Sequence, residues 1–146
     1  MVQDIAGAFI KTGFYPVFPE VELASRYPQS DFPDDLGDYD VIAVNQSKKE
    51  IWLIESKVLQ KVGSIYEDQM QQKSFFYQHK DDEKFQRRID YIRNNLSKVT
   101  SVLELETVDY VVIPYMVTNK LFTSRYKKLD FPIISYHELM RKLEDY

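Results

Sequence analysis

The chain begins with apolar residues at helical spacing and then changes to the alternation typical of strands. The helical set predicts a short amphipathic helix, and Gly13 follows where a left-handed C-terminal cap lies. From Phe14 to Leu23 apolar and polar residues alternate, but Pro16 and Pro19 restrict this segment to an edge strand or an irregular one. The helical set is Val2, Ile5, Ala6, Phe9 and Ile10.

A β-hairpin is predicted in the next part of the chain. Residues 31–38, with Pro33 and Gly37, form a loop. Two apolar segments follow, 39–44 and 51–58, and the polar residues 45–50 join them.

The second half of the chain alternates between helix and strand. Residues 64–95 have a helical pattern with a break near 79–82, and 108–117 is an apolar run typical of a strand buried on both faces. Ile133 and Ile134 predict a shorter strand, and Ser135 with Glu138 forms a capping box for a last helix. The order predicts an α/β fold with a central mixed β-sheet flanked by helices, over 1–146 as a single domain.

Composition narrows the class of protein. The 146 residues suffice for one domain with a real core. Cysteine is absent, and no apolar run reaches the roughly 20 residues that span a bilayer, so a cytoplasmic protein without membrane contact is expected. The net charge of -4 argues against nonspecific coating of nucleic acid, which needs many phosphate contacts.

Polar residues interrupt the apolar pattern at the end of the second hairpin strand. Because side chains alternate, Glu55 and Lys57 share one face. If Asn45 lies opposite Glu50, Asp40 lies opposite Glu55, and Asp38 lies opposite Lys57. Two carboxylates facing each other need a positive partner, and magnesium accepts one or two carboxylates while keeping several waters. Lys57 could then orient a bound water or stabilise charge on a phosphate.

These two segments resemble the core of the PD-(D/E)XK nuclease superfamily, the restriction-endonuclease-like fold. The resemblance rests on Gly37-Asp38-Tyr39-Asp40-Val41-Ile42-Ala43-Val44 and Ile51-Trp52-Leu53-Ile54-Glu55-Ser56-Lys57. It extends to the αβββαβ order of elements along the chain. It implies that Asp40 and Glu55 bind Mg²⁺, with Mn²⁺ as an alternative, together with the backbone carbonyl of Ser56, and that Lys57 is catalytic.

The function implied is metal-dependent hydrolysis of phosphodiester bonds. DNA is expected rather than RNA because it is the commoner substrate of that family, and a homodimer is an open expectation because many such enzymes dimerise to cut both strands. The chain departs from the family in its first helix: many members carry a glutamate there, whereas this helix offers only Gln3 and Asp4 near its start. Either that ligand is absent or the chain is a fragment of a longer protein. The literal Pro33-Asp34 pair lies in the loop, so Asp40 is preferred.

Further polar residues are candidates with an equally simple alternative, a solvated helix surface. Related nucleases place a Gln or Lys after the hairpin, which indicates Gln69, Gln72 and Lys73 as accessory residues, besides Asp38. A basic group could follow a phosphate backbone. It consists of Lys80, Lys84, Arg87 and Arg88.

Two other functions stay open on the sequence alone. A catalytically inactive module of the nuclease fold could bind nucleic acid or a protein partner. An unrelated α/β domain, in which Lys57 pairs with Asp38 or Asp40, is the third interpretation.

Overall fold

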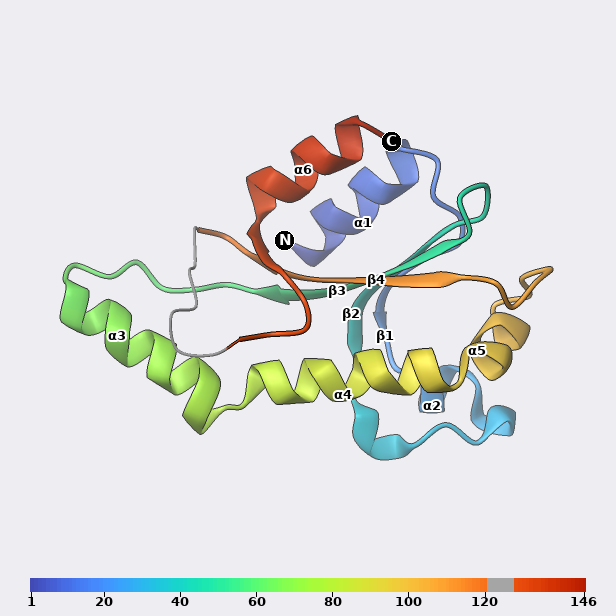
Figure 1. The fold of residues 1–146 in the computed structure, drawn as a ribbon, viewed down its shortest axis with the longest axis horizontal. Coiled ribbons are helices and arrows are strands. Elements are labelled where there is room, and N and C mark those ends of the chain that lie inside the picture. The colour runs from blue at the N-terminus through green and yellow to red at the C-terminus, as the bar shows by residue number, and fades with distance from the viewer. Residues whose placement is uncertain (121–127) are drawn as a thin grey trace.

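A five-stranded mixed sheet forms the centre of the protein, as expected (Figure 1). The computed structural model describes residues 1–120 and 128–146. β2 is antiparallel to both of its neighbours, β1 and β3, whereas β3, β4 and β5 are parallel to one another. In sheet order the strands are β1 (Val17–Val21), β2 (Tyr39–Asn45), β3 (Glu50–Lys57), β4 (Val111–Thr118) and β5 (Ile133–Ser135).

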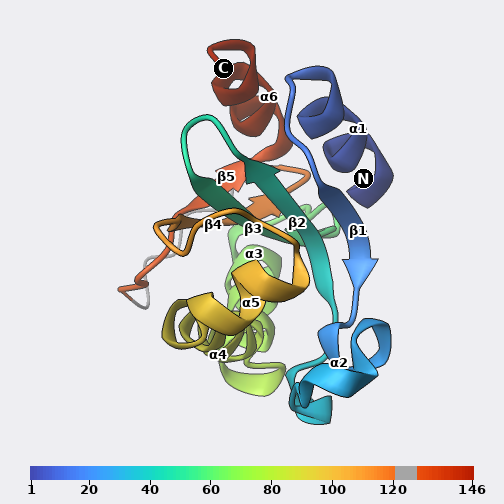
Figure 2. The ribbon, with the colours of Figure 1, turned by 90° about the vertical axis from the view of Figure 1, so that its right-hand side faces the viewer.

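Helices cover both faces of this sheet, so the fold has three layers (Figures 1 and 2). One face carries α1 (Val2–Lys11) and α6 (Tyr136–Glu144), and the other carries α4 (Asp81–Asn94) and α5 (Leu96–Val102). Within the described residues, no helix is long and apolar enough to cross a membrane.

The remaining helical segments are short. The predicted helical stretch after the hairpin divides into α3 (Ile65–Lys73), a π-helical turn (Ser74–Gln78) and α4. The one-turn helix α2 (Leu23–Arg26) was not predicted, because a single turn has too few residues to show a period. The separate 7-residue helix α5 was not predicted either.

Alternation along β3 divides the core in two, as the sequence predicts. Ile51 and Leu53 pack with α4 and α5, whereas Trp52 and Ile54 pack with α1 and α6. The register with β2 is also confirmed, since the pairs run from Asn45 opposite Glu50 to Val41 opposite Ile54.

The two edges of the sheet are irregular or short. β1 contains Pro19, and the next residue, Glu20, has a left-handed backbone with φ of 50°. β5 has only 3 residues, and it leads into α6 through the predicted capping box. There Ser135 Oγ accepts a hydrogen bond from the Glu138 amide at 3.2 Å, while Glu138 Oε2 accepts one from the Ser135 amide at 2.7 Å.

We predict that helix α1 is held to the sheet by one face only. Ile5 is fully buried, whereas Ile10 on the same helix is 60% exposed. Ile5→Ala should lower the free energy of unfolding by about 2 to 5 kcal/mol because it leaves a cavity. Ile10→Ala is the control and should change it by no more than about 0.5 kcal/mol. Urea denaturation of both variants measures the difference, and equal effects would contradict this packing.

Candidate functional site

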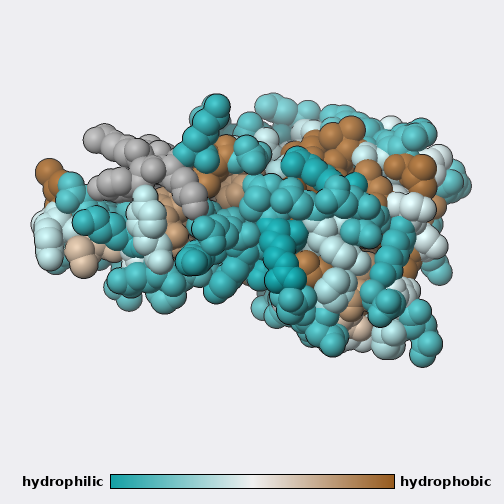
Figure 3. Space-filling view, turned by 60° about the horizontal axis from the view of Figure 1, so that its bottom comes forward, coloured by the Kyte–Doolittle hydropathy of each residue, from teal (hydrophilic) through white to brown (hydrophobic). Residues whose placement is uncertain are grey.

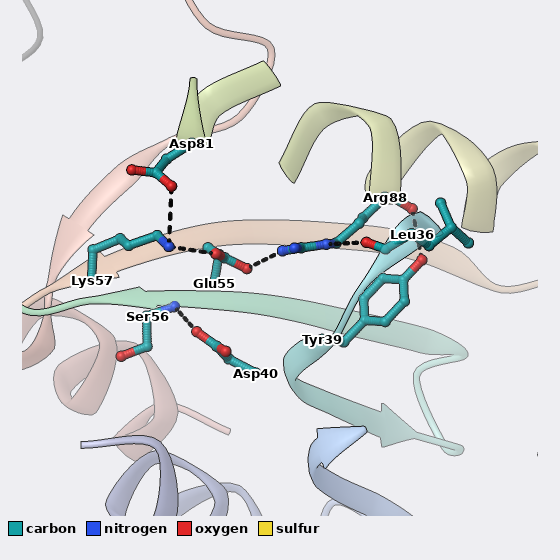
Figure 4. A network of polar contacts seen from close by, with 8 residues as sticks. All are labelled: Leu36, Tyr39, Asp40, Glu55, Ser56, Lys57, Asp81 and Arg88. Atoms are coloured by element: carbon teal, nitrogen blue, oxygen red, sulfur yellow. Dashed lines mark hydrogen bonds and ion pairs between the residues drawn. The ribbon is translucent and has the colours of Figure 1, made fainter. Parts of the chain in front are cut away.

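The candidate site is built around a buried carboxylate at the end of β3. Glu55 is 5% exposed and projects from the sheet toward α4 (Figure 4). Its Oε2 lies 2.7 Å from Arg88 Nη1, and its Oε1 lies 3.0 Å from Lys57 Nζ. Each carboxylate oxygen therefore has a cationic partner, as a buried charge requires.

Arg88 is fixed by the loop that precedes β2 as well as by Glu55. Its Nε donates a hydrogen bond to the Leu36 carbonyl at 2.8 Å, and the Tyr39 hydroxyl donates to the Arg88 carbonyl at 3.2 Å. Gly37 has φ of +72°, and a Cβ there would lie 3.2 Å from Arg88 Nη2. Glycine therefore suits this position, because it adopts the backbone conformation and lets the loop approach the guanidinium closely.

Lys57 lies between two acids. Besides Glu55, it contacts Asp81 Oδ1 at 3.4 Å. Asp81 and Arg88 are both on α4 and lie about two turns apart, so one side of this helix supplies a partner to each end of the Lys57 and Glu55 pair. The sequence reading missed Asp81, although its spacing from Arg88 was available as a signal.

The side chain of Asp40 contacts the backbone of the same strand, β3. Its Oδ2 accepts a hydrogen bond from the Ser56 amide at 2.6 Å (Figure 4). Within the described part of the chain, Oδ1 makes no hydrogen bond. The recorded pairing of β2 with β3 ends at Val41, so Asp40 lies one step beyond it. Ser56 thus contributes an amide donor, and metal binding by its carbonyl stays a prediction.

Burial and neighbouring charge shift the acidity of this group. Burial raises the pKa of Asp40. It also raises the pKa of Glu55, where the charge of Asp40 adds to the shift and the two cations oppose it. Burial alone would lower the pKa of Lys57, but Glu55 and Asp81 raise it overall, so Lys57 keeps its proton at neutral pH.

An open cleft adjoins Lys57. We call it the α3 cleft; its volume is about 710 Å³. The β3–α3 loop forms one wall, and α3 with the segment that follows it forms the other. Its lining also includes Asp81, so the cleft and the charged group share two residues.

The accessory residues expected from the sequence lie in different environments. Asp38, Gln69 and Lys73 are exposed, and Lys57 pairs with Glu55 and Asp81 instead of Asp38. Gln72 is buried and donates a hydrogen bond to Asp68 Oδ2 at 2.9 Å. Gln71, which the sequence reading did not select, lines the α3 cleft.

The predicted basic group is dispersed over α4 and its start. Lys80 and Lys84 are exposed, and Arg87 pairs with Asp35 at 2.6 Å on the surface. Arg88 faces inward to Glu55 and is therefore apart from the other three. The face on which α4 lies is mostly hydrophilic (Figure 3), as these exposed charges imply.

Asp40 and Glu55 are the carboxylates that could hold a cation. Over residues 1–120 and 128–146, no group of three or more His, Cys, Asp or Glu side chains is arranged to hold a metal ion. Magnesium needs only one or two carboxylates, so the pair fits in number and in ligand type. The oxygens best placed to bind it are Asp40 Oδ1, since the Ser56 amide occupies Oδ2, and Glu55 Oε1. A metal on Oε1 would displace Lys57, but Arg88 could stay on Oε2.

Comparison of the chain with protein-family models, curated proteins and solved structures gives no significant match.

We predict that Arg88→Met destabilises the protein in a pH-dependent way. It leaves the Glu55 charge without its closest partner, which should cost about 3 kcal/mol or more at neutral pH. Loss of Arg88 raises the folded-state pKa of Glu55 further. Between the unfolded and the folded pKa of Glu55, the folded protein holds a proton that the unfolded chain has released, so the free energy of unfolding falls as pH rises through this range. At about pH 4, near the ordinary pKa of glutamate, the defect should shrink.

Arg87→Met is the matched control for this prediction. Arg87 and Asp35 form an exposed pair, so its loss should cost about 0 to 1 kcal/mol. Adding Glu55→Gln to Arg88→Met should restore most of the lost stability at neutral pH. Urea denaturation between pH 4 and pH 7 measures all three, and a pH-independent defect in Arg88→Met would contradict the ion pair.

Proposed function

We propose that this protein is a metal-dependent phosphodiesterase that hydrolyses nucleic acid, with DNA rather than RNA as substrate. One observation carries the proposal: Asp40 binds the amide of Ser56, the residue between Glu55 and Lys57. Two carboxylates and a lysine therefore meet at the end of β3, beside an open cleft. Their resemblance to the PD-(D/E)XK pattern supports the same reaction.

The residues of the site would divide the work of phosphodiester hydrolysis among them. Asp40 and Glu55 would hold Mg²⁺, or Mn²⁺ in its place. When bound, the metal would polarise a phosphoryl oxygen and lower the pKa of a bound water. Lys57 is protonated, so it would stabilise the negative charge that develops on the phosphate rather than accept a proton. Asp81 would keep Lys57 at the mouth of the α3 cleft.

A second candidate, a nuclease-fold module that binds without cutting, is supported by the pairing of Glu55. Arg88 and Lys57 already neutralise both of its oxygens, so a metal must compete with Lys57 for one of them. In that case the charged group stabilises the fold, and the α3 cleft binds nucleic acid or a protein partner without cutting.

Metal binding and DNA nicking should depend together on Asp40. We expect Asp40→Asn to weaken Mn²⁺ and Mg²⁺ binding at least about tenfold and to abolish metal-dependent plasmid nicking, because it removes a ligand charge. Binding should also weaken as pH falls, since both carboxyl groups have raised pKa values and must lose their protons to bind a cation. Calorimetric titration and a nicking assay in the same buffers measure these effects.

Asp38→Asn is the matched control because Asp38 is exposed and only two residues away. It should leave metal affinity and nicking unchanged. Lys57→Met should abolish nicking while metal binding persists or strengthens, since a competing cation has gone. Wild-type protein that neither binds metal nor nicks DNA would support the non-catalytic module instead.

A further inference from the structure

Helix α3 presents its apolar side chains outward and buries a polar one. Ile65 is 80% exposed, Tyr66 is 70% exposed and Met70 is 44% exposed. Gln72 is only 6% exposed, and among residues 1–120 and 128–146 its Oε1 has no hydrogen-bond partner. A helix that serves only the core shows the opposite pattern. A small apolar area is visible among hydrophilic residues at the α3 end of the molecule in Figure 3.

The α3 cleft next to this surface is held in shape by the side chains of the two residues that follow β4. Asn119 Oδ1 accepts a hydrogen bond from the Leu59 amide at 2.7 Å, and Asn119 Nδ2 donates to the Leu59 carbonyl at 3.0 Å. Lys120 Nζ contacts the Gln60 carbonyl at 2.7 Å and Gln71 Oε1 at 2.9 Å. The β3–α3 loop is thus anchored at consecutive residues, and the cleft is formed before any ligand arrives.

The lining of the α3 cleft combines an aromatic ring with few charges. Tyr66 supplies an exposed ring, and Val58 and Met70 add apolar surface. Among the ionised groups of the lining, Lys57 and Lys61 balance Glu67 and Asp81. This balance does not favour a long, rigid polyanion, whose binding depends on many phosphate contacts.

The size of the cleft limits what can enter it. A volume of about 710 Å³ lies within the range of pockets that bind one small-molecule ligand. One nucleotide has the size of such a ligand. In a duplex each base is stacked and paired, so a base must leave the duplex before it can enter a pocket. Aromatic stacking with a small number of cationic contacts is the usual means of binding single strands.

We propose that the α3 cleft binds single-stranded nucleic acid, with a base against Tyr66 and the adjoining phosphate at Lys57. The position of the phosphate rests on the function proposed above, whereas stacking on Tyr66 does not. Cutting would therefore take place at unpaired ends or in unpaired stretches, including those that negative supercoiling opens in a plasmid. The exposed apolar face of α3 is the surface over which the bases of the strand continue.

The test is binding of fluorescent oligothymidylate of about 12 nucleotides, compared with a blunt duplex, in EDTA so that no cleavage occurs. We expect at least about tenfold tighter binding of the single strand. Tyr66→Ala should weaken it about 5- to 150-fold, the loss of one stacked base, and Tyr66→Phe should retain it. With Lys57 and Lys61 each on a phosphate, log Kd should change with log salt by a slope of about 1.4.

Tyr77→Ala is the matched control, because Tyr77 is 57% exposed and does not belong to the cleft lining. It should bind like the wild type. Equal affinity for duplex and single strand, or no effect of Tyr66→Ala, would overturn the inference. So would self-association in sedimentation that Tyr66→Ala abolishes without any oligonucleotide binding, since the surface would then belong to a protein partner.

The two proposals can fail separately. Tyr66-dependent binding of single strands without metal-dependent nicking would uphold the cleft and reject the phosphodiesterase. Asp40-dependent nicking of a fully paired duplex that Tyr66→Ala leaves unchanged would uphold the phosphodiesterase and reject the cleft.

Discussion

The burial of one negative charge, that of Glu55, sets much of the arrangement around β3. A carboxylate at the end of an apolar strand is costly unless cations and hydrogen bonds surround it. Arg88 meets this need from α4, and the same guanidinium binds the Leu36 carbonyl in the loop before β2. Three segments that are distant in sequence, namely that loop, β3 and α4, are therefore held together at one point. Gly37 permits the close approach that this junction needs.

The same junction decides what chemistry is available. Three carboxylates, Asp40, Glu55 and Asp81, gather around two cations, Lys57 and Arg88. The two cations offset most of the negative charge of the three acids, so the group attracts a further cation less strongly than bare carboxylates would. Burial acts in the same direction, because it favours the neutral forms of the acids. Catalysis would require a metal to replace Lys57 on one oxygen, whereas binding alone would leave the network as it is.

Local patterns predicted the fold well, but long-range contacts decided the details of the site. The hairpin register and the two faces of β3 followed from alternation, and the cap at Ser135 followed from a four-residue motif. The partner of Glu55 could not be read in this way, because Arg88 lies 33 residues further along the chain. The sequence predicted a positive group between Asp40 and Glu55 and assigned that role to a metal, which stays a prediction. In the structure the cations Lys57 and Arg88 lie against Glu55. The sequence also did not predict the outward apolar face of α3, because the spacing of apolar residues alone does not show which side of a helix packs against the sheet.

The irregular backbone of β1 has a consequence for how this protein meets other molecules. An exposed edge strand invites a strand from another chain to pair with it, which leads to aggregation. Here Pro19 lacks an amide donor, and the left-handed turn at Glu20 disturbs the line of the strand. The opposite edge, β5, is too short to offer more than a brief template. The sheet therefore resists growth by backbone pairing at either side, and recognition is left to side chains.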